Sequence, residues 1–149
     1  MASQALKLAE ELVKRFEGLR LAPYRDAVGF WTVGWGHLLS RDKSVPQPPA
    51  ITIEKAYEYL KKDLLRAFKA VLRLCPVVLS PHQLGALTSF SFNVGAGNLE
   101  LSTLRRQVLR GEHEEVPNQL QRWVYAGGVK LSGLVKRRIA EGLLYARGH

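Results

Sequence analysis

The sequence has very little cysteine: Cys75 is the only one among 149 residues. An intramolecular disulfide bond is therefore excluded, and no grouping of cysteine and histidine has the spacing of a metal site. The four histidines are scattered, at positions 37, 82, 113 and 149, and we expect neither a metal ion nor a cofactor. A catalytic cysteine is the alternative, but the apolar neighbours of Cys75 favour a packing role.

Long apolar runs are also missing. No segment approaches the roughly 18 consecutive apolar residues of a membrane span. The first residues read as an amphipathic helix with acidic side chains, unlike a secretory signal, so we expect no membrane anchor. The contents of 46% apolar and 23% charged residues are ordinary for a soluble globular protein. The length predicts a single domain that covers residues 1–149.

Basic residues outnumber acidic ones by 22 to 13, which gives a net charge of +9. Such a charge favours a polyanionic partner or target. The basic excess is spread over the whole chain, without a run of consecutive basic residues or a nucleic-acid-binding signature, so we expect no specific nucleic acid partner. Charge alone does not separate a protein that acts on a polyanionic cell surface from a non-catalytic domain that binds nucleic acid or disrupts membranes.

The N-terminal segment predicts a helix that ends in a carboxylate. Ser3 can cap this helix and Gly18 is a natural stop, which places Glu17 in its last turn. The negative end of the helix dipole favours the protonated form of a carboxyl group there, so Glu17 could donate a proton. The apolar side chains recur at the steps of one helical face, at Leu6, Ala9, Leu12, Val13 and Phe16.

Two short runs of strand formers follow, separated by a turn that contains Asp26. We interpret them as a β-hairpin. If residues 30–37 are extended, Thr32 shares one face with Gly34 and Gly36, where a ligand can approach the backbone closely. Glu17, Asp26 and Thr32 then form a plausible hydrolytic constellation. The alternative is a surface Glu, a turn Asp and a strand Thr without catalytic function.

This constellation resembles the active-site signature of the phage-type lysozymes, family 24 of the glycoside hydrolases. Glu17, Asp26 and Thr32 match in type and spacing, and Val-Gly-Trp-Gly-His-Leu follows Thr32. Further matches to the C-terminal half of that family occur in the same order at residues 89–95, 102–104, Trp123, 127–128, 133–134 and 137–141.

The remaining sequence predicts mostly helices. Residues 40–50 hold three prolines and read as a loop, Thr52 can cap a long helix to about residue 74, and Ser80 opens a buried one. The last helix is expected from about Leu134 to Ala146. Because the strand signal is confined to residues 20–38, the fold class is α+β and mostly helical. The resemblance implies a lysozyme-like fold, with a small β-hairpin lobe at about 15–50, a connecting helix at about 52–74 and a helical lobe at about 80–149.

The resemblance also implies an activity. A member of this family is expected to be a phage endolysin that hydrolyses the β-1,4 bond between N-acetylmuramic acid and N-acetylglucosamine in peptidoglycan. Glu17 would be the general acid, Asp26 the general base of an inverting reaction, and Thr32 would position the water. A lytic transglycosylase is the alternative enzyme; it needs no base, so the presence of Asp26 and Thr32 favours hydrolysis.

Further roles follow from the same resemblance. His37 and Asp63 are expected to form a charged pair, and Arg137 or Arg138 to reach Glu17. The alternatives are solvated side chains. Where relatives have a polar cleft residue, this chain has Pro117 followed by Asn118, and Phe92 could equally belong to the core. The expected saccharide contacts are Leu38, Phe92, Thr103 and Asn118.

The expected partners and location also come from the resemblance. The partner is peptidoglycan, reached through a separate holin-type permeabilising protein. The protein is expected to be a monomer that stays in the host cytoplasm until lysis and then acts on the cell wall in the periplasm.

Overall fold

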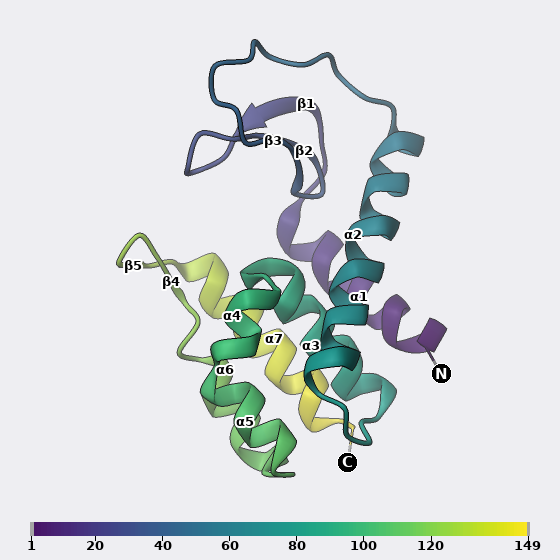
Figure 1. The fold of residues 1–149 in the computed structure, drawn as a ribbon, viewed down its shortest axis with the longest axis vertical. Helices are drawn as coiled ribbons and strands as arrows, with labels where there is room; N and C mark the ends of the chain where they lie inside the picture. The colour runs from purple at the N-terminus through teal and green to yellow at the C-terminus, as the bar shows by residue number, and fades with distance from the viewer. Residues whose placement is uncertain (1, 149) are drawn as a thin grey trace. The chain divides into compact units, whose positions relative to one another are not determined.

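The structure, a computed structural model, describes residues 2–148. The chain folds as two compact units. Unit 1 comprises Met1–Leu12 and Leu64–His149, and unit 2 comprises Val13–Asp63. Both boundaries fall inside helices, α1 (Ala2–Glu17) and α2 (Ile53–Leu74). Figure 1 shows the order of the elements along the chain.

Unit 2 contains an antiparallel sheet of three strands in the order β1-β2-β3. These strands are β1 (Arg20–Arg25), β2 (Trp31–Gly34) and β3 (His37–Ser40). The expectation of a two-stranded hairpin was therefore incomplete. Gly34 and Gly36 have φ values of +66° and +73°, so the chain reverses between them instead of remaining extended. The expectation that Gly36 shares a strand face with Thr32 was wrong for the same reason.

Helix α1 ends as expected, since Gly18 follows it with φ +71°. Its start differs from the prediction: Ser3 already lies within the helix and is not its cap. Of the predicted apolar face, Ala9, Leu12 and Val13 are buried, whereas Leu6 and Phe16 are half-buried.

Helix α2 runs without interruption for 22 residues, as the absence of internal proline and glycine predicted. Thr52 caps its start, where the side-chain oxygen accepts a hydrogen bond of 3.1 Å from the backbone N–H of Lys55. At its other end, Arg105 Nε donates a 2.7 Å bond to the carbonyl oxygen of Leu74. No helix among residues 2–148 is long and apolar enough to cross a membrane.

The remainder of unit 1 is mostly helical. A second, two-stranded sheet pairs Tyr125 with Lys130, so the expectation of one small sheet was wrong. Trp123 lies beyond the end of the helix Val116–Leu120. The elements are α3 (Pro81–Val94), α4 (Ala96–Leu101), α5 (Thr103–Leu109), a 3₁₀ turn η1 (His113–Glu115), α6 (Val116–Leu120), β4 (Tyr125–Ala126), β5 (Val129–Lys130) and α7 (Ser132–Ala146).

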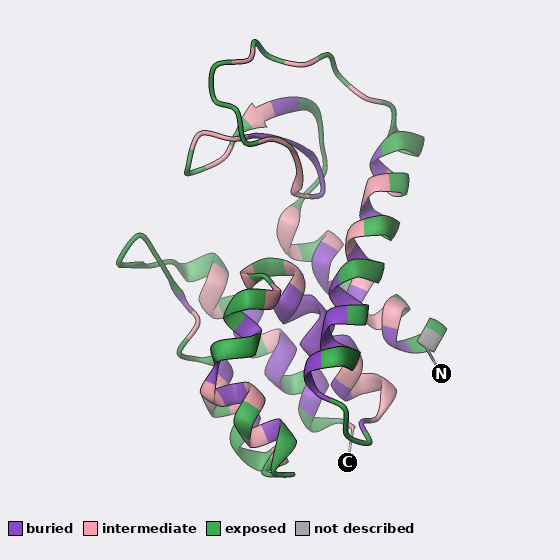
Figure 2. Ribbon diagram, viewed as in Figure 1, coloured by how far each residue is buried: buried purple, intermediate pink, exposed green. Residues whose placement is uncertain are grey.

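Helix α3 forms the centre of unit 1 and is buried along most of its length (Figure 2). It opens with the expected capping box, in which Ser80 and Gln83 satisfy each other's backbone N–H groups at 2.8 and 3.1 Å. A Cβ atom at Gly85 would lie 3.1 Å from the carbonyl oxygen of Ala5 and 3.0 Å from Cβ of Leu8. The absence of a side chain at Gly85 therefore lets α3 lie against the first part of α1.

Cys75 lies in the core of unit 1, with 1% of its surface exposed. Burial raises the pKa of its thiol to about 11, and the nearby charge of Arg105 offsets this only in part. A neutral, buried thiol is a poor nucleophile, which favours the packing role over a catalytic one.

Candidate active site

Glu17, at the end of α1, lies against the turn between β2 and β3. An added Cβ atom at Gly36 would be only 2.7 Å from Glu17 Oε1 and 3.3 Å from its Cδ. Real Cβ atoms essentially never come so close to a neighbouring oxygen. The glycine that was expected to admit a ligand therefore admits the carboxyl group of Glu17.

Asp26 occupies the turn between β1 and β2, where the backbone holds its carboxylate. Its Oδ1 accepts hydrogen bonds from the backbone N–H groups of Val28, Gly29 and Phe30, at 3.0, 2.9 and 2.9 Å. Because Oδ2 receives none of these three bonds, one oxygen of Asp26 is anchored and the other can accept a proton.

Thr32 lies on β2 with 5% of its surface exposed, and its hydroxyl group donates a 3.2 Å bond to the carbonyl oxygen of Phe30. A hydroxyl that donates to the protein can still accept a hydrogen bond from water. Thr32 is therefore fixed by the same turn that holds Asp26.

Tyr24 is a residue of this neighbourhood that the sequence interpretation missed. It is the partner of Thr32 across β1 and β2. Burial raises the pKa of its phenol; the negative charges of Glu17 and Asp26 add to this effect, while Arg20, 4.6 Å from the ring, opposes it. The negative charges of both carboxylates thus raise the pKa of the same phenol. Its position two residues before Asp26 was the available signal.

His37 and Asp63 come together in unit 2. His37 Nδ1 donates to Asp63 Oδ2 at 2.8 Å, which joins β3 to α2. The imidazole ring also stacks on Tyr59, with ring centres 3.8 Å apart and planes at 5°. The pair fixes the strand that follows the Gly36 turn.

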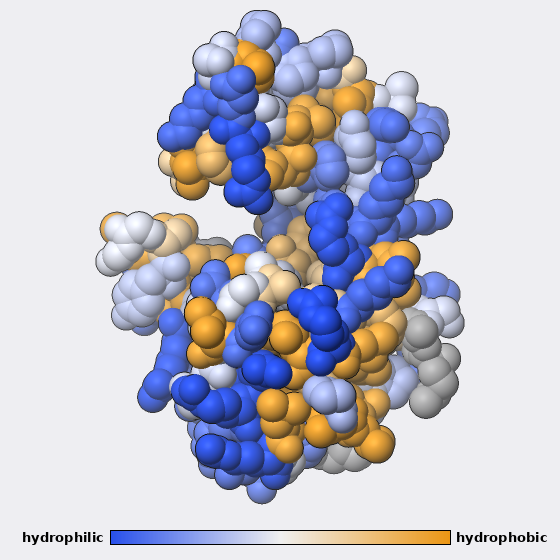
Figure 3. All heavy atoms as spheres, viewed as in Figure 1, coloured by the Kyte–Doolittle hydropathy of each residue, from blue (hydrophilic) through white to orange (hydrophobic). Residues whose placement is uncertain are grey.

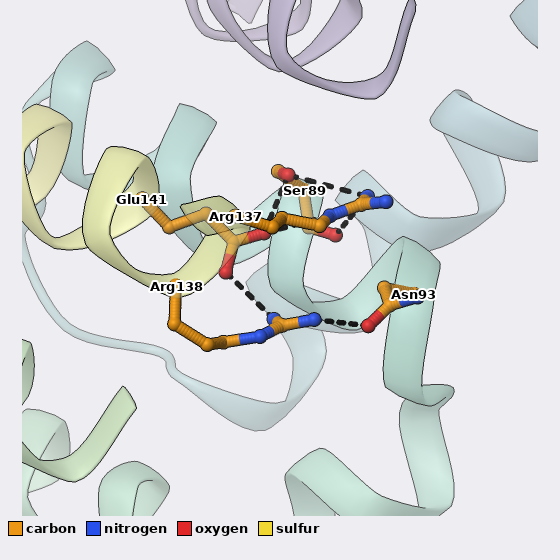
Figure 4. Close-up of polar contacts among 5 residues, drawn as sticks. All are labelled: Ser89, Asn93, Arg137, Arg138 and Glu141. Atoms are coloured by element: carbon orange, nitrogen blue, oxygen red, sulfur yellow. Dashed lines mark hydrogen bonds and ion pairs between the residues drawn. The ribbon is translucent and has the colours of Figure 1, made fainter. Parts of the chain in front are cut away.

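Arg137 and Arg138 converge on one buried carboxylate in unit 1 (Figure 4). Arg138 Nη1 donates to Glu141 Oε1 at 2.6 Å, and Arg137 Nε donates to Oε2 at 3.2 Å. The Ser89 hydroxyl also donates to Oε2, at 2.6 Å, and Arg138 binds the side-chain oxygen of Asn93. Burial raises the pKa of Glu141, although both guanidinium groups act in the opposite direction.

Comparison with known proteins identifies the family. The phage lysozyme model matches residues 14–141. This chain belongs to the phage lysozyme family. The "SAR-endolysin" of Bacteriophage PS119 is 38% identical over 125 residues, which cover 84% of this chain and 73% of that protein.

Two solved structures of similar proteins agree with this assignment. The muramidase domain of SpmX from Asticaccaulis excentricus gives a TM-score of 0.81 at 33% identity, covering 92% of this chain and 93% of that one. The endolysin of Escherichia coli O157:H7 phage FAHEc1 gives 0.81 at 29% identity, covering 93% and 90%. The lysozyme-like α+β fold is thus confirmed, and membership of this family supports a peptidoglycan-lytic enzyme.

The four saccharide contacts expected of a phage lysozyme lie in both units. Leu38 is half-buried on β3, Phe92 is half-buried on α3, and Asn118 is exposed on α6. Thr103 opens α5, where its hydroxyl oxygen accepts a 3.0 Å bond from Arg106 Nη2. Their contacts with a saccharide remain predictions, as does the contact of Arg137 or Arg138 with Glu17.

The described part of this chain contains no group of three or more histidine, cysteine or acidic side chains that could hold a metal ion.

The packing of Glu17 against the β2–β3 turn gives a testable expectation. Gly36→Ala should lower peptidoglycan hydrolysis by about a hundredfold, because the new methyl group displaces the carboxyl group by a fraction of an ångström or more. Turbidity clearing of permeabilised Gram-negative cells measures this loss.

Gly111→Ala is the matched control. It places alanine at a similar φ of +74° in unit 1, and apart from the chain neighbours of Gly111 nothing lies within 4 Å of the added Cβ atom. Both variants carry similar backbone strain, and only the first places a methyl group against Glu17. Equal losses of activity in the two variants would contradict the positioning of Glu17 by Gly36.

Proposed function

We propose that this phage lysozyme family member is a muramidase that hydrolyses the β-1,4 bond between N-acetylmuramic acid and N-acetylglucosamine in peptidoglycan. The observation that carries the proposal is the placement of two carboxyl groups in unit 2. Glu17 lies against the β2–β3 turn, and Asp26, in the turn between β1 and β2, has an oxygen anchored by three backbone amides. A pair of carboxyl groups is what glycoside hydrolysis requires.

In this proposal Glu17 donates a proton to the leaving glycosidic oxygen. Asp26 accepts a proton from a water molecule that attacks the anomeric carbon from the opposite face of the sugar, and Thr32 orients that water through its hydroxyl oxygen. Such an inverting reaction requires a separation of about 6.5–9.5 Å between the two carboxyl groups. The anchored Oδ1 of Asp26 supports this role, since it fixes the direction of the other oxygen.

The supporting residues have proposed roles as well. Leu38, Phe92, Thr103 and Asn118 would contact the glycan chain. Arg137 or Arg138 would reach Glu17, and the His37 pair with Asp63 would hold the strand beside it.

Within the cell, we propose that the protein is a monomeric endolysin that a separate holin-type protein releases from the host cytoplasm to the wall. The endolysin names of its relatives support the endolysin role alone.

The stereochemistry of the product tests the mechanism. Single displacement on a β-linked chain yields the α-anomer first, which proton NMR can follow before mutarotation. A product that first appears as the β-anomer would exclude Asp26 as a base for water, because it would show retention.

The same digest separates hydrolysis from lytic transglycosylation. Hydrolysis leaves reducing ends, whereas a transglycosylase leaves anhydro ends that are lighter by one water molecule. Mass spectrometry of the muropeptides should show reducing ends, because Asp26 and Thr32 are suited to activating water. Anhydro ends would establish the alternative.

A further inference from the structure

One stretch of unit 1 is basic and free of acidic residues. Between Glu115 and Glu141 the sequence contains no Asp or Glu but five basic residues. Arg137 and Arg138 are buried on Glu141. The other three, Arg122, Lys130 and Lys136, are exposed. This stretch therefore presents uncompensated positive charge to solvent.

The same stretch carries the hairpin of β4 and β5, which projects from the helices of unit 1 (Figure 1) and is exposed along its length (Figure 2). Three large side chains are open to solvent, with exposed fractions of 59% for Tyr125, 60% for Val129 and 42% for Leu131. In Figure 3 the projecting segment carries pale and orange side chains beside blue ones. Such a surface of mixed character, with an exposed tyrosine, is suited to recognition.

A hollow of about 330 Å³ adjoins the hairpin, lined by Lys130, Ser132, Val135 and Lys136. Among the described residues, neither lysine ammonium has a hydrogen-bond or ion-pair partner. Two lysines, a serine and a valine thus line one concave site, in which the aliphatic parts of the side chains form most of the wall and the charged groups belong to the two lysines. This set of groups is suited to a carboxylate ligand with small apolar substituents.

We propose that this hollow binds the carboxylate groups of the stem peptides of peptidoglycan, an inference that rests on the proposed muramidase function. The glycan strand is uncharged once each lactyl group is amide-linked to a peptide. The sugars therefore offer no negative charge with which the lysines could form an ion pair. The stem peptides carry free carboxylates and alanine methyl groups. Lys130 and Lys136 bind the carboxylates, and Val135 contacts a methyl group.

An anionic lipid bilayer is a different partner for the same charges. Sequence clusters that bind acidic lipids carry about four to eight lysines and arginines. This stretch exposes three, and two of them line a hollow instead of a flat face. A concave site selects a discrete chemical group, which favours the peptide.

The test compares two double variants of equal charge change on two substrates. Lys130→Gln/Lys136→Gln removes the lysines of the hollow. Lys7→Gln/Lys69→Gln removes two exposed lysines of unit 1 that do not line it. The substrates are intact sacculi and the same sacculi after an amidase has removed the stem peptides and the lactyl carboxyl groups thus exposed have been converted to methylamides, so that the glycan is uncharged.

On intact sacculi, the KM of Lys130→Gln/Lys136→Gln should rise about tenfold at unchanged kcat, because two exposed ion pairs are lost. On peptide-free glycan, its KM should equal that of the wild type. The control should match the wild type on both substrates, and thermal unfolding of both variants should be unchanged.

Three outcomes would overturn the inference alone. They are equal KM changes on the two substrates, no change on either, and loss of sedimentation with phosphatidylglycerol vesicles at unchanged KM, which would assign the surface to a bilayer. A wild type that cleaves neither substrate would instead overturn the proposed function, and the inference with it.

Discussion

Glu17→Gln is expected to lower the rate of peptidoglycan hydrolysis by about 10²–10⁴-fold, the usual contribution of a general acid. The amide has nearly the same volume as the carboxyl group and can occupy the same space against Gly36, but it has no proton to give the leaving oxygen. The fold should therefore be unchanged while the activity is lost. Release of reducing ends from purified sacculi measures the rate, and thermal unfolding measures the stability.

Glu11→Gln is the appropriate control, since it makes the same change at an exposed position of the same helix. This variant should keep wild-type activity. A Glu17→Gln enzyme with more than about a tenth of the wild-type rate would exclude Glu17 as the acid, because general acid catalysis is worth at least about a hundredfold.

Glu141→Gln should destabilise the protein strongly. The carboxyl group is 0% exposed and lies between two guanidinium groups, so its removal leaves buried positive charge without a counter-charge. Breaking a buried ion pair in this way costs about 3–5 kcal/mol. At about 2–4 °C per kcal/mol for a chain of this size, the Tm should fall by about 6–20 °C.

Two further variants make this expectation specific. Glu100→Gln, at an exposed position of unit 1, should change the Tm by no more than about 2 °C. Arg138→Met combined with Glu141→Gln should cost less than the sum of the two single changes, because the double variant removes both charges of one pair. A loss below about 1 kcal/mol for Glu141→Gln alone would show that the cluster contributes little to stability.

Helix starts could be predicted at two capping side chains, although Ser3 was wrongly predicted to be a third. Thr52 and Ser80 each accept a backbone hydrogen bond at the expected helix start. These signals are local, since a cap and the N–H group it satisfies lie within three residues of each other. A capping interaction of this kind can be predicted from the sequence without knowledge of the tertiary structure.

The third strand could not be predicted in this way, because glycine is compatible both with an extended strand and with a left-handed turn. Gly34 and Gly36 both have positive φ values and form the turn, with Ala56 next to Gly34 and Glu17 next to Gly36. The strands at Tyr125 and Val129 have two residues each, too few for a period of two to be detected.

The candidate site was predictable in part. The types and spacing of Glu17, Asp26 and Thr32 were visible as a constellation, but the participation of Tyr24 depends on strand register, which the sequence did not specify. Glu141 follows Arg137 and Arg138 by four and three residues, the spacing of ordinary surface ion pairs. Only its complete burial distinguishes it, and burial results from packing against α3.

The contact between Gly85 and the first part of α1 has a consequence for the order of events on the ribosome. Residues 1–12 belong to unit 1, but α3 is synthesised about 80 residues later, which takes about 4–16 s at 5–20 residues per second. Residues 13–63 are contiguous and can pack in the meantime. We therefore expect the apolar face of the first turns of α1 to remain exposed on the nascent chain until Gly85 emerges. During that time chaperones can bind it.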